Sequence, residues 1–470
     1  MLPKVIGFLL IPVYTVYLSP QDFGLVDLAT SLGAFILVFM RLGVPGSVLR
    51  FYFDHQEGEA LKDYITTIFW FLLGCSLIVG AVTALILYTT GDKIVPGLPF
   101  YPFVVMILIW AFFNSNTDLQ RRLLQAREQS AYSAKLSTIT ALLTISLTIL
   151  FVIALKWGAV GVVGATVITA IVFFIQGQVY LHKDLKGKFS WSQLIPSFTY
   201  AMGILPYHLI SNAAPVINKS ILSGYESLAA VGILGIALRF TIPLTIFISA
   251  LQSSFTPLYY SVRTDEQESL KGKKNLGDLV VRIWSVALLL LAGIICFGGL
   301  AIQLFTTEKF HEAIHLLPGI SISFIIGLAA YIFGNEIYYQ KKTWWVAIIS
   351  TVQVGVNFVG LLLFLPLFGL IGVGYAMLVA AIVAAILQVL VARKYYQFSI
   401  PWKKFLLSIV LMLGLVFLSH LIDTRLILWR MIYFGFLFVI FVWAMFYFKL
   451  LQLQWIPLIN KIAKKYHERR

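Results

Sequence analysis

The sequence predicts an all-α polytopic membrane protein with fourteen transmembrane helices, from its composition, its apolar runs and the distribution of its charges. Of its 470 residues, 60% are hydrophobic and 12% are charged, and the mean hydropathy is +0.91. No soluble core needs that much apolar surface, so the solvent for most of the chain is lipid. The net charge of +15 could suggest nucleic acid as a partner. The basic residues cluster at helix ends on one side of the membrane instead, as topology determinants do, so nucleic acid is not expected.

Apolar runs of about 20 residues, the length that spans about 30 Å of hydrocarbon, occur fourteen times. The first begins at the initiator Met1 and leads into more membrane, so no cleavable signal peptide is expected. The predicted spans are 2–18, 24–49, 64–88, 100–120, 132–155, 158–182, 193–222, 229–261, 279–305, 314–339, 343–366, 369–392, 405–422 and 429–449.

The distribution of Lys and Arg predicts the orientation of these spans. With the N-terminus inside, the inner segments hold 27 of the 35 basic residues, the outer connections hold five, and three lie within spans. This is a strong positive-inside asymmetry, so both termini should be cytoplasmic. The basic tail 451–470 is either a helix on the inner leaflet or a solvated tail.

A faint internal repeat predicts how the spans are grouped. Gly24 through Tyr52 in the second span resembles Gly232 through Tyr260 in the eighth, at an offset of 208 residues. An offset of six helices preserves orientation, which is a known plan of transporters. We therefore expect two pseudo-symmetric six-helix bundles and two added helices. The predicted boundaries are 1–183, 184–394, 395–450 and the tail 451–470.

Three basic side chains, Arg41, Lys219 and Arg239, lie inside predicted spans, and the sequence offers no carboxylate at comparable depth. A charge in hydrocarbon costs roughly 2.5–3.5 kcal/mol, so it usually faces a cavity and a partner. We therefore expect these cations to bind an anionic substrate, and guanidinium groups match phosphate oxygens well. Lys219 could instead snorkel to the outer surface. Arg50 is either an entry point for the anion or an ordinary positive-inside arginine.

Other polar residues have two open interpretations. Asp27 and Glu336 lie only a turn or two inside their spans, where carboxylates are usually solvated or paired with basic groups, although coupling to protons or sodium is an alternative. The remaining residues could form a polar gate and cavity lining, or only kink and hydrogen-bond packed helices. They are Asn212, Pro215 and Asn218 in the seventh span, and Gln353 and Asn357 in the eleventh.

Catalytic constellations are absent from the sequence, so an enzyme is not expected. We find no phosphate-binding glycine loop and no zinc-ligand spacing. Cys75 and Cys296 both fall in apolar segments and imply neither a disulfide framework nor a metal site. No cofactor is expected beyond a possible coupling ion, H⁺ or Na⁺.

Short motifs along nearly the whole chain resemble the polysaccharide flippases of the multidrug/oligosaccharidyl-lipid/polysaccharide (MOP) exporter superfamily, the Wzx-like or O-antigen transporter group. Family members often show an Asp-Arg pair where Asn218 and Lys219 stand. The motifs are Tyr17-Leu-Ser-Pro-Gln-Asp-Phe-Gly24, Leu42-Gly-Val-Pro45 running into Arg50-Phe-Tyr-Phe53, Arg121-Arg-Leu-Leu-Gln-Ala126, and Asn218-Lys-Ser-Ile-Leu222 with Ala230-Val-Gly232.

The resemblance implies two six-helix bundles around a central cavity, and a flippase that moves a polyprenyl-pyrophosphate-linked oligosaccharide across the bacterial inner membrane. Membrane lipid, polysaccharide polymerases and glycosyltransferases are the implied partners, and a monomer is expected. A lipid II flippase and a cation-coupled multidrug antiporter of the same fold remain open alternatives. A membrane glycosyltransferase or polymerase is disfavoured, because it would need a sizeable catalytic loop.

Overall fold

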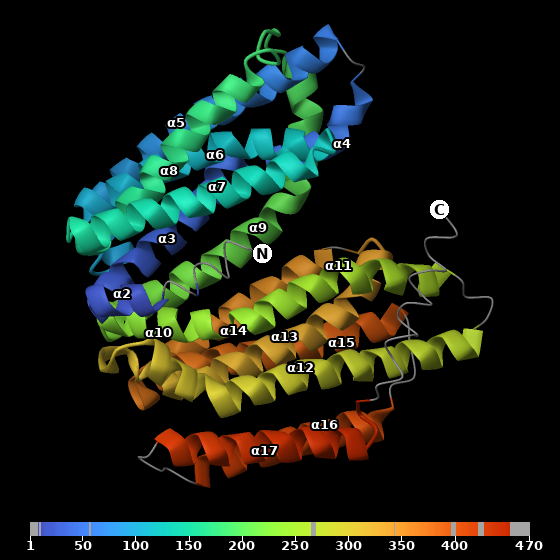
Figure 1. Cartoon of the computed structure of the whole chain (residues 1–470). Coiled ribbons are helices and arrows are strands. Elements are labelled where there is room, and N and C mark those ends of the chain that lie inside the picture. The colour runs from blue at the N-terminus through green and yellow to red at the C-terminus, as the bar shows by residue number, and fades with distance from the viewer. Residues whose placement is uncertain are drawn as a thin grey trace. The chain divides into compact units, whose positions relative to one another are not determined.

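The computed structural model describes residues 8, 11–55, 58–264, 269–342, 344–395, 401–421 and 427–451, and the regular structure within them is helical (Figure 1). Residues 2–7, 9 and 10 of the predicted span 2–18 lie outside the described residues, and so does the tail from 452 onward. The longer helices are α2 (Ile11–Tyr17), α3 (Pro20–Arg41), α4 (Val44–Phe51), α5 (Glu59–Ile94), α6 (Val105–Ala126), α7 (Ser130–Ile149), α8 (Gly158–Leu181), α9 (Trp191–Tyr225), α10 (Leu228–Phe240), α11 (Ile242–Thr264), α12 (Ser269–Phe305), α13 (Ala313–Tyr339), α14 (Trp344–Phe368), α15 (Ile371–Tyr395), α16 (Trp402–Leu421) and α17 (Ile427–Tyr447).

Helices occupy the positions of the predicted spans, and the protein is a multi-pass membrane protein. Among the described residues, ten helices are long and apolar enough to cross a membrane, or eleven if α10 and α11 count as one broken span. The short α2, the polar α9 and the apolar segment Met431–Tyr447 of α17 are not among these ten. The exact number of fourteen spans therefore stays a prediction.

Two of the predicted spans are interrupted helices. The predicted span 24–49 is divided between α3 and α4, because Leu42 and Gly43 adopt left-handed backbone conformations with φ of 45° and 73°. Glycine adopts this conformation without steric cost, and Pro45 stands in the first turn of α4, where its missing N–H is tolerated. The predicted span 229–261 is likewise divided between α10 and α11, next to Pro243.

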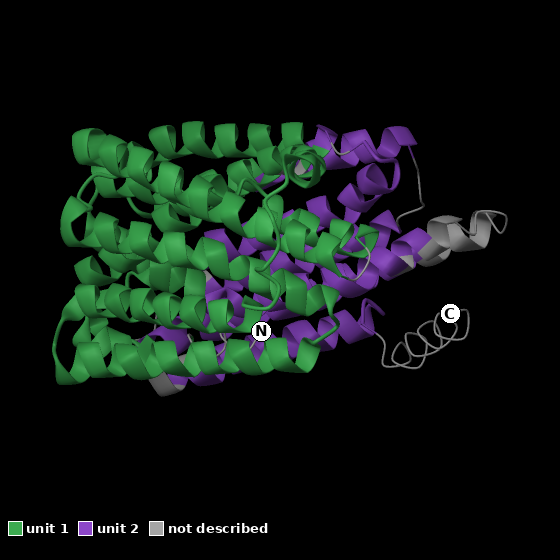
Figure 2. Ribbon diagram, turned by 90° about the horizontal axis from the view of Figure 1, so that it is seen from above, with its two compact units in different colours: residues 1–239, 305–316, 346–380 green, residues 240–304, 317–345, 381–470 purple. Residues whose placement is uncertain are grey.

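The chain forms two compact units, coloured separately in Figure 2. These units are not delimited at 183 and 394, so the bundle boundaries and the pseudo-symmetry predicted from the repeat stay predictions. Unit 1 comprises Met1–Arg239, Phe305–Leu316 and Val346–Ala380, and unit 2 comprises Phe240–Leu304, Leu317–Trp345 and Ala381–Arg470.

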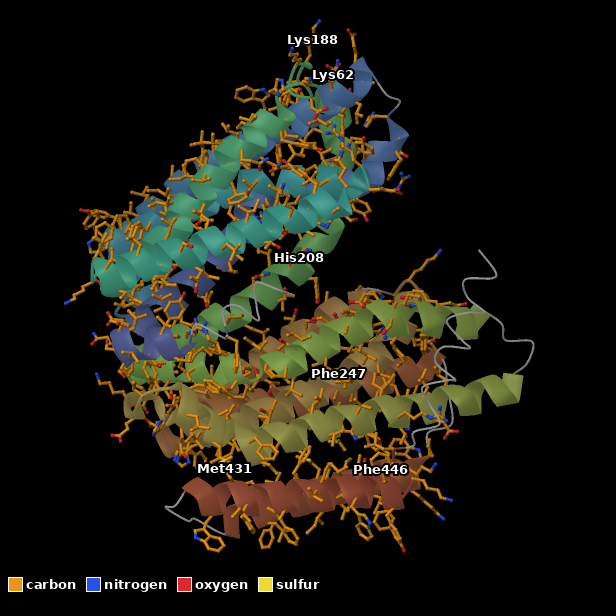
Figure 3. All side chains as sticks on the ribbon, in the orientation of Figure 1. Lys62, Lys188, His208, Phe247, Met431 and Phe446 are labelled. Carbon is orange, nitrogen blue, oxygen red and sulfur yellow. The ribbon has the colours of Figure 1, made fainter. Side chains whose placement is uncertain are left out.

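In unit 1, segments predicted to lie inside meet at one end. Figure 3 shows Lys62 and Lys188 together at this end, and the Lys188 N–H donates to Asp63 Oδ1 at 2.5 Å. Arg127 after α6 forms a 2.7 Å ion pair with Asp184 after α8. The three basic segments 50–63, 121–135 and 183–188 therefore share one end of unit 1, as the positive-inside pattern requires.

The opposite end of unit 1 carries segments predicted to lie outside. The Ser223 hydroxyl donates to the Pro96 carbonyl at 2.6 Å, and the Phe310 ring packs on Phe23 at 5.6 Å between centroids. Helix α3 begins at this end with a capping box, in which Ser19 and Asp22 satisfy each other's backbone N–H groups. Helix α3 thus runs from the outer-loop end of unit 1 towards its basic end.

In unit 2, contacts between apolar side chains and close packing at a glycine hold the helices together. The Trp284 ring of α12 packs on Phe405 of α16 at 5.0 Å, and Phe297 packs on Phe438 of α17 at 5.4 Å. The Gly334 position of α13 is so close to the Gln388 side chain of α15 that a Cβ there would lie 2.5 Å from the amide nitrogen. Small residues allow such close helix packing inside a membrane.

Candidate functional site

The deep cations of unit 1 have carboxylate partners, so the sequence-based expectation that no protein acid meets them is wrong. Lys219 and Arg239 lie beside Asp27, and Arg41 lies beside Asp118. In the sequence, Asp27 lies only a turn or two inside its predicted span and Asp118 lies close to the end of the predicted span 100–120, so neither was expected to reach the deep cations. In the fold, helices bring these carboxylates against cations that are distant in the sequence. The cations form two separate clusters along α3.

The outer cluster contains Asp27, Lys219 and Arg239. The Lys219 ammonium lies 2.6 Å from Asp27 Oδ2 and also donates to the Ser31 hydroxyl at 2.7 Å. The Arg239 guanidinium lies farther away, at 3.8 Å from Asp27 Oδ1, and stacks over the Phe23 ring at 4.2 Å from its centroid. Asp27 is therefore engaged mainly by Lys219. One acid between two bases leaves the cluster with a formal charge of +1.

Glycines bring the helices of this cluster together. A Cβ at Gly24 of α3 would lie 1.8 Å from the Leu228 carbonyl oxygen, and a Cβ at Gly232 of α10 would lie 2.0 Å from the Pro20 carbonyl oxygen. The two helices therefore cross with their backbones in direct contact. One turn further along α10, a Cβ at Gly235 would lie 2.8 Å from Asp27 Oδ2, so Gly235 leaves room for the carboxylate.

The inner cluster forms where α3 ends against α6. The Arg41 Nη2 group donates to both the backbone carbonyl and the side-chain oxygen of Asn114, each at 2.9 Å. Asp118 Oδ2 lies 3.8 Å from Arg41 Nη1 and 3.8 Å from Arg122 Nε. Asn114, Asp118 and Arg122 are spaced by four residues, so they share one face of α6. This cluster also holds one acid between two bases.

Both clusters lie on the same side of α3. Asp27 and Arg41 are fourteen residues apart in the helix. That separation is about 21 Å along the axis, and the two side chains differ in direction by only about 40°. Between them, Ser31, Ala34 and Val38 are half-buried on this side, whereas neighbouring positions such as Leu32 and Ile36 are buried. The half-buried side of α3 thus joins two positively charged clusters.

Hydrogen-bond donors remain unused in each cluster. Within the described residues, Arg41 Nε, Arg122 Nε and Arg239 Nη1 are buried nitrogen atoms without a hydrogen-bond partner. A buried donor without a partner costs stability comparable to a lost hydrogen bond. Anionic oxygens are the ligands that guanidinium N–H groups bind most strongly. The geometry therefore suits the binding of an anion.

The predicted polar residues of the seventh and eleventh spans are partly brought together. Asn357 of α14 donates its side-chain amide to Asn218 of α9, directly beside Lys219. Asn212 donates to the His208 carbonyl of its own helix at 2.9 Å, and Gln353 is half-buried in α14. Pro215 is exposed within α9. A role for these five residues as gate or cavity lining stays a prediction.

Arg50 and Glu336 lie in other surroundings. Arg50, at the end of α4, forms an exposed ion pair with Asp54 through Nη1 at 2.6 and 2.7 Å. In unit 2, Glu336 is buried and accepts hydrogen bonds from the Tyr259 hydroxyl and the Gln340 amide, both at 2.7 Å. The predicted entry role of Arg50 and the predicted coupling roles of Glu336 and Asp27 are not tested by these contacts.

Four residues of the clusters were not predicted from the sequence: Asn114, Asp118, Arg122 and Gly235. The first three repeat every fourth residue, and this spacing marks one helix face. The pattern says nothing about which helix that face meets. The closeness of Gly235 to Asp27 likewise follows from the crossing of α3 and α10, which pairs positions 208 residues apart.

Comparison with solved structures defines the class of fold. The chain has the fold of MOP-superfamily transporters. It is similar to the lipid II flippase MurJ in an inward closed conformation, with a TM-score of 0.74 and 15% identity over 96% of this chain and 98% of that one. It is also similar to an inward-facing multidrug resistance MATE family transporter, with a TM-score of 0.63 and 16% identity over 83% of this chain and 94% of that one.

A third similar structure is a MOP superfamily transporter from Pyrococcus furiosus, described for the reverse polarity of its binding pocket. The TM-score is 0.55 and the identity 16%, over 84% of this chain and 93% of that one. Comparison with curated proteins finds no match. The model of the polysaccharide biosynthesis protein family matches residues 17–315. The chain belongs to this family, which confirms the resemblance noted in its motifs.

Proposed function

We propose that this protein is a flippase that moves a polyprenyl-pyrophosphate-linked oligosaccharide from the cytoplasmic to the outer leaflet of a bacterial inner membrane. The observation that carries the proposal is the pair of positively charged clusters on one side of α3, each with buried guanidinium donors that lack partners. Membership in a polysaccharide biosynthesis family supports an oligosaccharide as cargo.

In the proposed mechanism, the pyrophosphate and any acidic sugars bind first at Arg41 and then at Arg239, with Lys219 beside it. Desolvation of the anion against fixed guanidinium groups offsets part of the cost of moving a polar headgroup through the membrane. The prenyl tail remains in lipid while the protein alternates between inward-open and outward-open states. Arg50 is proposed as a first contact at the basic end, and a proton or sodium gradient as the source of energy.

The same proposal includes the topology, the oligomeric state and the partner enzymes of the protein. Both termini are cytoplasmic, the protein acts as a monomer, and glycosyltransferases and a polymerase supply and consume its lipid-linked substrate. The polar residues Asn212, Pro215, Asn218, Gln353 and Asn357 are proposed to line or gate the path, and Asp27 or Glu336 to take part in coupling.

Two alternatives of the same fold remain candidates. A lipid II flippase would use the same chemistry for the same pyrophosphate group, and complementation of peptidoglycan synthesis separates the two. A cation-coupled multidrug antiporter needs an acid that is available to a cationic drug. In unit 1, Asp27 and Asp118 each lie between two basic groups, which disfavours cationic cargo there.

The proposed function is tested by replacing each deep arginine in a cell that depends on this gene for glycan export. We expect Arg41→Ala and Arg239→Ala to lower export by about tenfold or more, because loss of a charge-assisted contact to phosphate costs at least about 1.5 kcal/mol. Arg393→Ala, on an exposed position of α15, is the matched control and should export normally. Normal export by both deep variants at wild-type protein levels would refute the proposal.

A further inference from the structure

Asp118 differs from the other paired carboxylates of unit 1 in how loosely it is held. Its Oδ2 atom is equidistant from two guanidinium groups, at 3.8 Å from Arg41 Nη1 and 3.8 Å from Arg122 Nε. Within the part of the chain that the structure describes, no hydrogen bond to either oxygen is formed. The carboxylate therefore neutralises part of the charge without satisfying the donors.

Two ion pairs in the same unit provide the contrast. Asp184 lies 2.7 Å from Arg127, and Asp27 lies 2.6 Å from Lys219, so each forms a direct charge-assisted contact. Such short pairs hold helices together. At 3.8 Å, attraction persists but the hydrogen bond is missing. The side chain of Asp118 is 12% exposed, and those of Arg41 and Arg122 are 23% and 35% exposed, so none of the three is fully buried.

The donors left over match a phosphate group. Arg41 Nε and Arg122 Nε are buried and have no hydrogen-bond partner among the described residues. Asn114 fixes the Arg41 guanidinium through two 2.9 Å hydrogen bonds, so its direction is set before any ligand arrives. Phosphate oxygens accept hydrogen bonds from such planar forks, and a second phosphate of a pyrophosphate adds more acceptors.

We propose that Arg41, Arg122 and Asn114 form an anion site for a phosphate or pyrophosphate group and that Asp118 is its resident counter-ion, which the ligand displaces. In the empty site, Asp118 holds the two guanidinium groups together against their mutual repulsion. The bound anion takes over their donors and moves the carboxylate aside. Return of the carboxylate then helps to expel the anion towards the outer cluster. The part of this inference that concerns cargo rests on the proposed function.

This arrangement predicts that one substitution at the site increases the affinity for an anion. Loss of the Asp118 charge removes a competitor from the site, so Asp118→Asn should bind an anion more tightly while transporting more slowly. A carboxylate that merely scaffolds the two arginines gives the opposite result, because its loss lets them separate and weakens binding. Arg122→Gln should weaken binding in either case, and it reports whether Arg122 belongs to the site.

The experiment measures binding of inorganic pyrophosphate and of a polyprenyl pyrophosphate to the full-length protein in detergent by titration calorimetry. We expect Asp118→Asn to bind both probes about tenfold more tightly and Arg122→Gln to bind them about tenfold more weakly. Removal of a like charge beside a bound anion raises its affinity, and removal of an opposite charge lowers it, by about this factor. Asp92→Asn, the same substitution on an exposed residue of α5, is the control and should match wild type. Asp118→Ser replaces Asp118→Asn if the latter does not fold.

Each outcome decides between the possibilities. If Asp118→Asn binds both probes more weakly than wild type or equally well, Asp118 is not a counter-ion that the ligand displaces. The proposed function still stands in that case if Arg41→Ala abolishes export. Tighter binding of inorganic pyrophosphate alone overturns the role in cargo binding and leaves a site for free phosphate. Tighter binding of both probes, together with reduced export in cells, supports the inference. Normal export by both Arg41→Ala and Arg239→Ala would refute the proposed function without changing the binding result.

Discussion

Lys219 is the most tightly paired of the deep cations. Its side chain is 9% exposed, and it contacts Asp27 at 2.6 Å and the Ser31 hydroxyl at 2.7 Å. Removal of one partner of a buried ion pair leaves the other charge in a medium that solvates it poorly. The sequence could indicate snorkelling of Lys219, but the contacts show an internal ion pair, which accounts for its place in an apolar segment. At the residue scale, Asp27 therefore neutralises the buried Lys219 ammonium, whether or not it also takes part in coupling.

We expect Asp27→Ala to lower the free energy of unfolding by roughly 3–5 kcal/mol, the range for breaking a buried pair. Thermal unfolding of the purified protein in detergent measures the change. Lys219→Met combined with Asp27→Ala should recover part of the loss, because the Lys219 ammonium is then no longer left unpaired and only the more distant Arg239 has lost its carboxylate. Asp54→Ala removes half of an exposed pair and should change stability little. If Asp27→Ala alone is as stable as wild type, the ion pair between Asp27 and Lys219 does not stabilise the fold.

At the scale of elements, the crossing of α3 and α10 depends on two glycines. Gly24 faces the Leu228 carbonyl and Gly232 faces the Pro20 carbonyl. The two glycines are 208 residues apart, the offset of the sequence repeat, and a Cβ at Gly232 would lie 3.0 Å from the Gly24 nitrogen. The equivalent positions of the repeat are thus in mutual contact. The same crossing brings Arg239 of α10 to Asp27 of α3. A change at either glycine should therefore disturb the outer cluster as well as the packing of the helices.

We expect Gly24→Ala and Gly232→Ala each to reduce the amount of folded protein and to lower its thermal unfolding temperature, because a methyl group at 1.8 or 2.0 Å from a carbonyl oxygen forces the helices apart. Gly74→Ala is the matched control. Nothing lies within 4 Å of a Cβ at that position of α5, and alanine favours a helix by up to about 1 kcal/mol over glycine. Wild-type unfolding temperatures for both crossing variants would show that the helices are not in contact.

At the scale of the whole molecule, the distribution of charge sets the orientation in the membrane. Three basic segments of unit 1 meet at one end, where Lys188 contacts Asp63 and Arg127 contacts Asp184. Segments around Pro96 and Phe310 lie at the other end, with few basic residues. Basic segments are retained in the cytoplasm during insertion. In unit 1, segments predicted to face the same side thus lie at the same end, and which end is cytoplasmic stays a prediction.

We expect a cysteine in place of Lys188 to react with a membrane-impermeant thiol reagent only from the cytoplasmic side, and a cysteine in place of Lys93 only from the outside. Both are introduced into a chain that lacks Cys75 and Cys296, which serves as the unlabelled control. Labelling of intact cells against inverted vesicles separates the two sides. Reaction of both cysteines from the same side would overturn the topology.

The sequence by itself determined the all-helical membrane fold, the approximate positions of most helices and the presence of three deep cations, because apolar length and charge are properties of a segment alone. Only the tertiary structure decided which groups meet. Asp27 reaches Lys219 and Arg239 across about 200 residues, and Asp118 reaches Arg41 across 77. Electrostatic partners depend on distance in space, and the crossing of helices sets this distance.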